Sequence, residues 1–225
     1  MSNYGIFVYT THKNFSRCQK ILETWGSDIK NLFFYTDRHA DPSTTQGTFI
    51  KATDDDTYAS NVVKNLYAIV DAYERRYDWS FFIGDDNYLF KQNFELYINS
   101  QNKEENSIFG AELSGTWPPD RSLSYLDGAA GILFNKGSLR NFVKLLDKNL
   151  EDYKHDSEFA DVVIEFIRQK GNIPMNTTNN DERLGGLYFG GLAPWDYNNR
   201  EMLRRAITLH SVSYTHLRAH ETDSY

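Results

Sequence analysis

The stretch Trp79-Ser-Phe-Phe-Ile-Gly-Asp-Asp-Asn-Tyr-Leu-Phe90 changes from apolar to acidic within a few residues. Its apolar run at residues 81–83 is typical of a buried strand, and Asp85 and Asp86 follow at the carboxyl end of that strand. Ligands of open α/β sheets bind beyond the carboxyl ends of the strands, so the two acids are candidates for holding a divalent cation. Alternatively, both acids are solvated carboxylates in a turn, because the residues Asp-Asp-Asn are also common in turns.

The chain before this stretch alternates between strand and helix patterns. Apolar spacing predicts two strands and two helices, namely strands at 5–10 and 31–36 and helices at 14–25 and 62–77. This alternation predicts an α/β fold with a mostly parallel central sheet flanked by helices, and it places the opening motif on an interior strand.

The composition limits the class of protein. A chain of 225 residues with 40 % apolar and 15 % aromatic content can bury the core of one domain, and a net charge of −7 argues against a broad nucleic-acid or anionic-membrane surface. Cys18 is the only cysteine, so no internal disulfide can form. No run approaches the ~20 apolar residues of a membrane span, and the start lacks a signal-peptide pattern, so we expect a cytoplasmic chain.

Polar residues after the first two predicted strands are candidates for nucleotide binding. Thr10, Thr11 and Arg17 fall in or just after the first turn, where their donors could meet a nucleotide phosphate. Threonines at such positions are about as often only helix caps or turn formers. Asp37 follows the second strand and is a second acid at a carboxyl end.

Three consecutive aspartates at residues 54–56 look at first like a better metal site than the Asp85-Asp86 pair. They stand where the long helix begins, so Asp56 or Thr57 is expected to cap free amide groups there. The negative charge also suits the dipole of that helix. We therefore favour a structural interpretation of the triplet.

The middle of the chain contains a run of small residues. A strand at 107–109 and an irregular loop at 115–119 precede the run Gly128-Ala129-Ala130-Gly131, which would let the backbone approach a ligand closely. The run lacks the spacing of a dinucleotide or Walker loop. Ser138 is expected to cap the following helix.

Three features remain in the last third of the chain. Asp161 lies in the first turn of a predicted helix, where it either stabilises the helix dipole or acts as a general base in a cleft. The glycine-rich stretch 185–191 is expected to be a mobile loop that closes over a ligand. His210 ends a strand-like segment, where a single histidine is more often structural than a ligand.

Residues 211–225 differ in kind from the rest of the chain. Their sequence from Ser211 onward resembles the translation of a transposase adapter used in preparing sequencing libraries. We expect a non-native tail in place of the native carboxyl terminus, and its histidines are left out of the ligand candidates.

Several stretches, in one order, resemble the fringe-like and core-1 galactosyltransferase-like β-1,3-glycosyltransferases, which share a GT-A-type nucleotide-sugar fold. The resemblance covers about residues 5–210. It is carried by Arg17 with Leu22-Glu-Thr-Trp25, by residues 77–90, by residues 125–133 with Leu139, by Asp161-Val-Val-Ile164 with Gly171, and by the terminal segment 207–210.

The resemblance implies a single GT-A-like domain at residues 5–210 that transfers a hexose or N-acetylhexosamine from a UDP-sugar to a glycan hydroxyl, with inversion and a β-1,3 linkage. Asp161 would deprotonate the acceptor. The ligands of a manganese or magnesium ion would be Asp85, Asp86, Asn87 and His210. The donor would also meet Thr10, Thr11, Arg17, Asp37, Gly128, Ala129 and Ala130.

The expected partners are a nucleotide-sugar donor and a glycan or glycoconjugate acceptor, with neither nucleic acid nor a membrane span. The membrane anchor and paired cysteines usual in that family are not seen, so we expect a cytoplasmic enzyme that builds a surface glycan. The alternative is a catalytically silent nucleotide-sugar or carbohydrate-binding module on the same fold. A metal-dependent phosphohydrolase is less favoured, because no nucleophilic Asp-x-Asp or dense His/Asp cluster appears.

Overall fold

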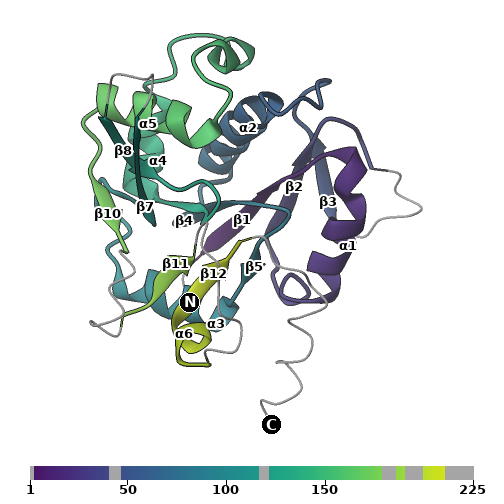
Figure 1. Ribbon diagram of the computed structural model, residues 1–225, viewed down its shortest axis with the longest axis vertical. Coiled ribbons are helices and arrows are strands. Elements are labelled where there is room, and N and C mark those ends of the chain that lie inside the picture. The colour runs from purple at the N-terminus through teal and green to yellow at the C-terminus, as the bar shows by residue number, and fades with distance from the viewer. Residues whose placement is uncertain (1–2, 41–46, 117–121, 179–185, 191–199, 211–225) are drawn as a thin grey trace.

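A seven-stranded sheet forms the centre of the structure, a computed structural model that describes residues 3–40, 47–116, 122–178, 186–190 and 200–210 (Figure 1). All neighbouring strands in it are parallel except on the two sides of β9. In spatial order the strands are β10 (Met175–Thr177), β6 (Ile108–Gly110), β9 (Ile132–Asn135), β4 (Trp79–Gly84), β1 (Tyr4–Tyr9), β2 (Leu32–Thr36) and β3 (Thr48–Lys51). The expected α/β architecture with a mostly parallel sheet is confirmed.

Both faces of the sheet are buried. Side chains alternate between the two faces along each central strand, and each set packs into its own core cluster. In β1, Ile6 and Val8 point into one core cluster while Phe7 points into the other. The first cluster includes side chains of α1 (Phe15–Glu23) and α3 (Lys91–Ser100). The second includes side chains of α2 (Ser60–Arg75), α4 (Lys136–Val143) and α5 (Ala160–Lys170), which lie on the opposite face of the sheet (Figure 1).

The acidic motif lies on an interior strand, as expected, because β4 pairs with β1 on one side and β9 on the other. All six residues of β4 are buried. The chain leaves β4 through Asp85 and Asp86 and enters the short strand β5 (Tyr88–Leu89). The motif is therefore anchored on both sides by strands.

Two smaller sheets complete the fold. A three-stranded sheet has the order β11 (Tyr188–Gly190), β12 (Ala206–Leu209) and β5, with α6 (Arg200–Arg205) just before β12. Because β12 runs antiparallel to β5, with Leu209 opposite Tyr88, the residue after β12 lies beside the acidic motif. The other sheet pairs β7 (Glu112–Thr116) with β8 (Ser122–Leu126), and the 3-10 helices η1 (His12–Asn14) and η2 (Leu150–His155) lie in loops.

Two expected helix caps are wrong. The long helix α2 begins at Ser60 and has no side-chain cap, so neither Asp56 nor Thr57 caps it. Asp55 instead accepts hydrogen bonds from the backbone amide and the hydroxyl of Thr57, which forms a turn before the helix. At α4, Asn135 is the cap and accepts from the Ser138 amide, because the helix begins at Lys136.

Two expected loops are strands in part. Tyr188–Gly190, within the stretch expected to be a mobile loop, forms the buried strand β11 because its aromatic residues pack into the core. Residues 115–116, expected in an irregular loop, end β7. Residues 117–119, 185 and 191 of these stretches and the expected non-native tail at 211–225 lie outside the described residues. None of the described helices combines the length and the apolarity that a membrane crossing requires.

One glycine in the turn before β9 cannot be replaced without strain. Gly131 has φ +88°, and a Cβ atom there would lie 2.5 Å from the ring of Phe81 in the core. A left-handed backbone conformation and a clash with a packed ring each cost free energy.

We predict that Gly131→Ala lowers the free energy of unfolding by at least about 2 kcal/mol, measured by urea denaturation. The control is Gly186→Ala, whose new methyl group would meet open space and should change stability by less than about 0.5 kcal/mol. Equal stability of the two variants would contradict the described turn.

Candidate functional site

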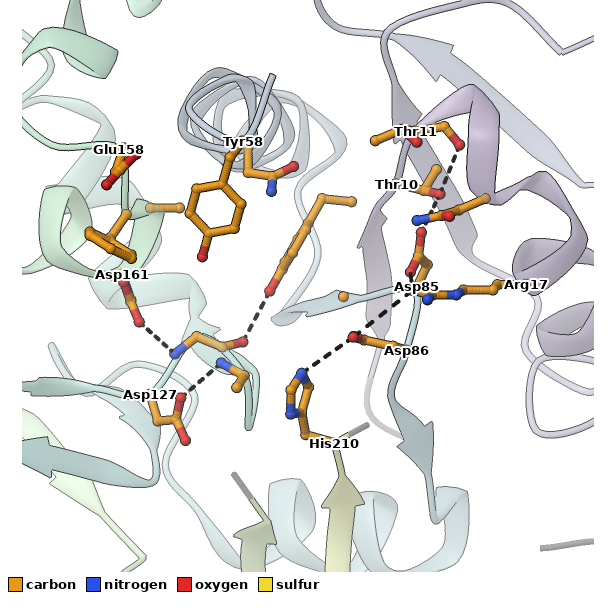
Figure 2. A pocket seen from close by; sticks show the side chains of 18 of the residues that line it. Thr10, Thr11, Arg17, Tyr58, Asp85, Asp86, Asp127, Glu158, Asp161 and His210 are labelled. Atoms are coloured by element: carbon orange, nitrogen blue, oxygen red, sulfur yellow. Dashed lines mark hydrogen bonds and ion pairs between the residues drawn. The ribbon is translucent and has the colours of Figure 1, made fainter. Parts of the chain in front are cut away.

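A cavity of about 440 Å³ lies at the carboxyl ends of β1 and β4. Such a position suits a ligand site, because the carboxyl ends of parallel strands leave a crevice in open α/β sheets. Its two walls carry side chains from several segments of the chain that are distant in sequence (Figure 2). One wall, the β1–β4 side, has Thr10, Thr11, Arg17, Asp85, Asp86 and His210; the other, the α5 side, has Tyr58, Tyr125, Asp127, Glu158, Phe159 and Asp161.

Asp85 is the buried centre of the β1–β4 side. The Thr10 hydroxyl donates to its Oδ2 at 2.6 Å, and Arg17 Nη1 donates to its Oδ1 at 2.9 Å. Only 5 % of Asp85 is exposed, so these donors stabilise a carboxylate that burial would otherwise destabilise. The two bonds join the ends of β1 and β4 to the first turn of α1.

Asp86 is more accessible and lies beside a histidine. Its Oδ2 is 3.3 Å from Nε2 of His210 and 4.0 Å from Nη1 of Arg17. Burial raises the pKa of the Asp86 carboxyl, but His210 and Arg17 together outweigh it and hold that pKa below its ordinary value. Asp86 is therefore a carboxylate at neutral pH, at the junction of β4 and β12.

Gly84 makes room for this carboxylate. A Cβ atom on Gly84 would lie 2.8 Å from Oδ1 of Asp86 and 3.2 Å from Oδ1 of Asn87. Glycine at the end of β4 thus permits the Asp86 side chain to fold back across the strand end.

The donor set at Asp86 and His210 fits a divalent cation. A carboxylate oxygen and an imidazole nitrogen are both acceptable ligands for Mn²⁺, and two protein donors leave positions for phosphate oxygens and water. Both side chains line the cavity, so an ion between them would be accessible to a ligand. The other two expected ligands are placed differently: Asp85 is held by Thr10 and Arg17, and Asn87 is fully buried outside the lining.

Asn87 is one of three side chains, from different elements, that hold the turn at residues 128–130. Its Nδ2 donates to the carbonyl of Ala129 at 2.7 Å. The hydroxyl of Tyr9 donates to the carbonyl of Gly128 at 3.0 Å, and the hydroxyl of Thr208 to that of Ala130 at 2.7 Å. Of the three expected donor-binding residues in this turn, Gly128 and Ala129 line the cavity, whereas Ala130 is fully buried.

Asp161 approaches the same turn from α5. Its Oδ2 accepts from the Gly128 amide at 3.2 Å, and its Oδ1 accepts from the Val162 amide at 2.9 Å. Burial raises the pKa of Asp161 above its ordinary value, and the nearby charge of Asp127 adds to that rise, while the two amides oppose it. The result is a carboxylate in the cavity wall that is more basic than an ordinary aspartate.

Gly128 permits the close approach of Asp161. A Cβ atom on Gly128 would lie 3.2 Å from both Cβ and Oδ2 of Asp161. The small residue expected to admit a ligand therefore also positions an acidic side chain.

Sequence reasoning did not single out most of the α5 side. The residues of this side that it missed are Tyr58, Tyr125, Asp127, Glu158 and Phe159, and it also missed Tyr9 at the end of β1. Tyr125 and Asp127 adjoin the small-residue run, and Glu158 and Phe159 immediately precede the α5 start, so proximity to the candidate residues was the available signal. Tyr58 follows the aspartate triplet and carried no comparable signal.

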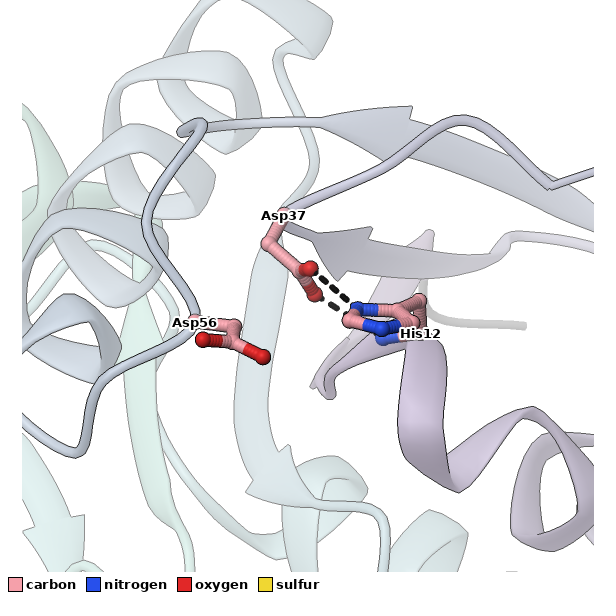
Figure 3. Close-up of side chains that lie close together, drawn as sticks. All are labelled: His12, Asp37 and Asp56. Carbon is pink, nitrogen blue, oxygen red and sulfur yellow. Dashed lines mark hydrogen bonds and ion pairs between the residues drawn. The ribbon is translucent and has the colours of Figure 1, made fainter.

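Asp37 lies in a separate cluster and is not among the residues that line the cavity (Figure 3). Its Oδ2 is 2.5 Å from Nδ1 of His12, and its Oδ1 accepts from the His12 amide at 2.8 Å. Burial raises the pKa of Asp37, but these two contacts outweigh it and lower that pKa below its ordinary value. The contacts tie the end of β2 to η1.

Asp56 joins His12 and Asp37 in this cluster. One potential ligand atom of each lies within 4.8 Å of the others, so the three could hold a metal ion. However, Oδ2 of Asp56 is 2.6 Å from Nζ of Lys13, and both Asp37 oxygens already interact with His12. Ion pairs and hydrogen bonds within the chain therefore account for the positions of these three side chains.

No protein-family model matches the chain, and no curated protein matches it. Fold and site geometry therefore carry the functional inference.

We predict that Thr10→Val destabilises the protein by about 1–3 kcal/mol, because the buried Asp85 loses a hydrogen-bond donor. The matched control is Thr11→Val in the same turn, since the Thr11 hydroxyl makes no capping hydrogen bond and should change stability by less than about 0.5 kcal/mol. Urea unfolding of both variants measures the difference. An equal loss in both would contradict the role of Thr10.

Proposed function

We propose that the chain is an inverting, metal-dependent glycosyltransferase that moves a hexose or N-acetylhexosamine from a UDP-sugar to a glycan hydroxyl, with a β-1,3 linkage. One observation carries the proposal. A carboxylate–imidazole pair beside an arginine occupies one wall of the cavity, and the Asp161 carboxylate, whose pKa is raised, occupies the opposite wall. This pairing suits a reaction in which a diphosphate leaves on one side and a hydroxyl attacks from the other.

The β1–β4 side suits the donor. Arg17 is exposed enough to meet a phosphate, and Thr11 adds a hydroxyl in the adjoining turn. Asp86 and His210 would hold Mn²⁺ or Mg²⁺. When bound, that cation stabilises the negative charge that develops on the departing diphosphate.

The α5 side suits the acceptor. Asp161 accepts the proton of the attacking hydroxyl as a general base, and its raised pKa makes it a stronger base than an ordinary carboxylate. The Gly128 and Val162 amides hold its two oxygens, so the base is fixed before the acceptor arrives. Attack from this side, opposite the leaving diphosphate, inverts the anomeric carbon.

We predict that Asp86→Asn weakens Mn²⁺ binding in the presence of UDP by at least about tenfold, because an amide replaces a charged ligand. Isothermal titration calorimetry measures this directly. Asp54→Asn is the matched control, since Asp54 is an exposed member of the aspartate triplet and is paired with Lys51. Unchanged Mn²⁺ binding in Asp86→Asn, or a loss confined to Asp54→Asn, would overturn the proposed metal ligand.

We predict that Asp161→Asn lowers kcat by about 10²–10⁴-fold while UDP and Mn²⁺ binding stay within about twofold of the unmodified chain, as loss of a general base requires. UDP release during transfer and calorimetry with UDP report the two quantities. A parallel loss of UDP binding would instead indicate a structural role for Asp161. Nucleotide binding by the unmodified chain with no transfer to any acceptor would favour the silent binding module.

The same base predicts the pH dependence of transfer. Asp161 must be ionised to accept a proton, and its pKa lies above the ordinary 3.8, so kcat/KM should rise with pH until this carboxyl is deprotonated. The acid limb of the profile should therefore lie above the range in which an ordinary aspartate titrates. A profile flat down to pH 4 would contradict this assignment.

A further inference from the structure

The cavity is divided by charge. On the β1–β4 side, Arg17 carries a positive charge beside the carboxylates of Asp85 and Asp86. On the α5 side, the lining includes Asp127, Glu158 and Asp161, and no lysine or arginine lines it among the residues that the structure describes. Figure 2 shows Glu158, Asp161 and Asp127 together at one end, with Arg17 at the other. A second ligand entering from the α5 side therefore meets a negative potential.

A pair of aromatic residues, exposed Tyr58 and partly buried Phe159, lies within this negative region. Tyr58 is 61 % exposed, and its ring meets that of Phe159 edge to face, with the centroids 5.7 Å apart. Burial raises the pKa of Tyr58, and the charges of Asp161, Glu158 and Asp86 add to that rise, so these carboxylates act on the same ring. A large exposed aromatic ring at a cavity mouth is available to cover an apolar surface of a ligand.

Glu158 is the member of the acidic group with no structural task of its own. Asp127 accepts from the Ala129 amide, and Asp161 accepts from two amides. Within the described part of the chain, Glu158 is exposed and makes neither a hydrogen bond nor an ion pair. Its charge is therefore directed at solvent and at whatever enters the cavity beside Tyr58.

We propose that the α5 side is an acceptor subsite for an uncharged sugar, in which Tyr58 and Phe159 cover the apolar face of the ring and Glu158 rejects acceptors that carry a carboxylate, sulfate or phosphate. This inference rests on the proposed function and names its acceptor class. A pyranose ring has hydroxyl groups around its edge and C–H groups on its faces, so an aromatic ring and nearby carboxylates match it. An anionic group there would face three like charges.

The test uses a pair of sugars that differ at carbon 6 alone. Methyl β-galactoside is uncharged, and methyl β-galacturonate carries a carboxylate. Their affinities for the full chain with UDP and Mn²⁺ are measured by saturation-transfer NMR. Like-charge repulsion predicts binding of the uronate at least about tenfold weaker than binding of the galactoside. The matched glucose pair is measured alongside it, and the same preference for the uncharged member is expected there.

Two variants separate charge from stacking. Glu158→Gln should improve uronate binding and so reduce the preference for the uncharged sugar to about threefold or less. Its control is Asp152→Asn, which removes an exposed charge outside the cavity and should leave the preference unchanged. Tyr58→Ala should weaken galactoside binding by about fivefold or more. Tyr73→Ala, at a partly exposed tyrosine on α2 that does not line the cavity, is its control.

The outcomes distinguish failure of the acceptor subsite from failure of the proposed function. Equal or tighter binding of the uronate, or an unchanged preference in Glu158→Gln, overturns the neutral-acceptor subsite. Transfer of sugar to the uronate in preference to the galactoside likewise overturns the subsite but supports the glycosyltransferase. The expected binding pattern without any transfer supports the subsite and contradicts the proposed function.

Discussion

Three hydrogen bonds to successive carbonyls, at Gly128, Ala129 and Ala130, hold the centre of the structure together. Their donors are Tyr9 at the end of β1, Asn87 after β4, and Thr208 in β12. Residues distant in sequence thus converge on one turn. The same turn presents the Gly128 amide to Asp161 on its other side. Because a buried carbonyl without a donor is costly, the spacing between the two walls of the cavity depends on these contacts.

The framework of the fold could be predicted from the sequence because its signals are local. The strands β1, β2 and β4 are short apolar runs, and the helices α1 and α2 each carry a regular apolar stripe, whereas β3, Thr-Phe-Ile-Lys, has no such signal. Helix ends and short strands could not be predicted in the same way. Asn135 rather than Ser138 caps α4 because the helix begins three residues earlier than the pattern suggests, and β11 forms because tertiary packing buries residues that look like a loop.

The candidate site was predictable where residues follow strands and unpredictable where tertiary contacts decide. Asp86 and His210 meet because β12 pairs with β5, a pairing that no local pattern encodes. Asn87 resembles a ligand in sequence, yet it faces the Ala129 carbonyl, and Asp37 is directed to His12 rather than to the cavity. The aromatic residues of the α5 side come from three separate segments, so only the fold brings them together.

The proposed function requires a cation between Asp86 and His210, rather than at the His12, Asp37 and Asp56 cluster. Crystals grown with Mn²⁺ and UDP, measured at a wavelength where manganese scatters anomalously, test it most directly. We expect one anomalous peak within ligand distance of Asp86 and His210, with the diphosphate between that peak and Arg17. A peak at His12, Asp37 and Asp56 with none beside Asp86 would contradict it.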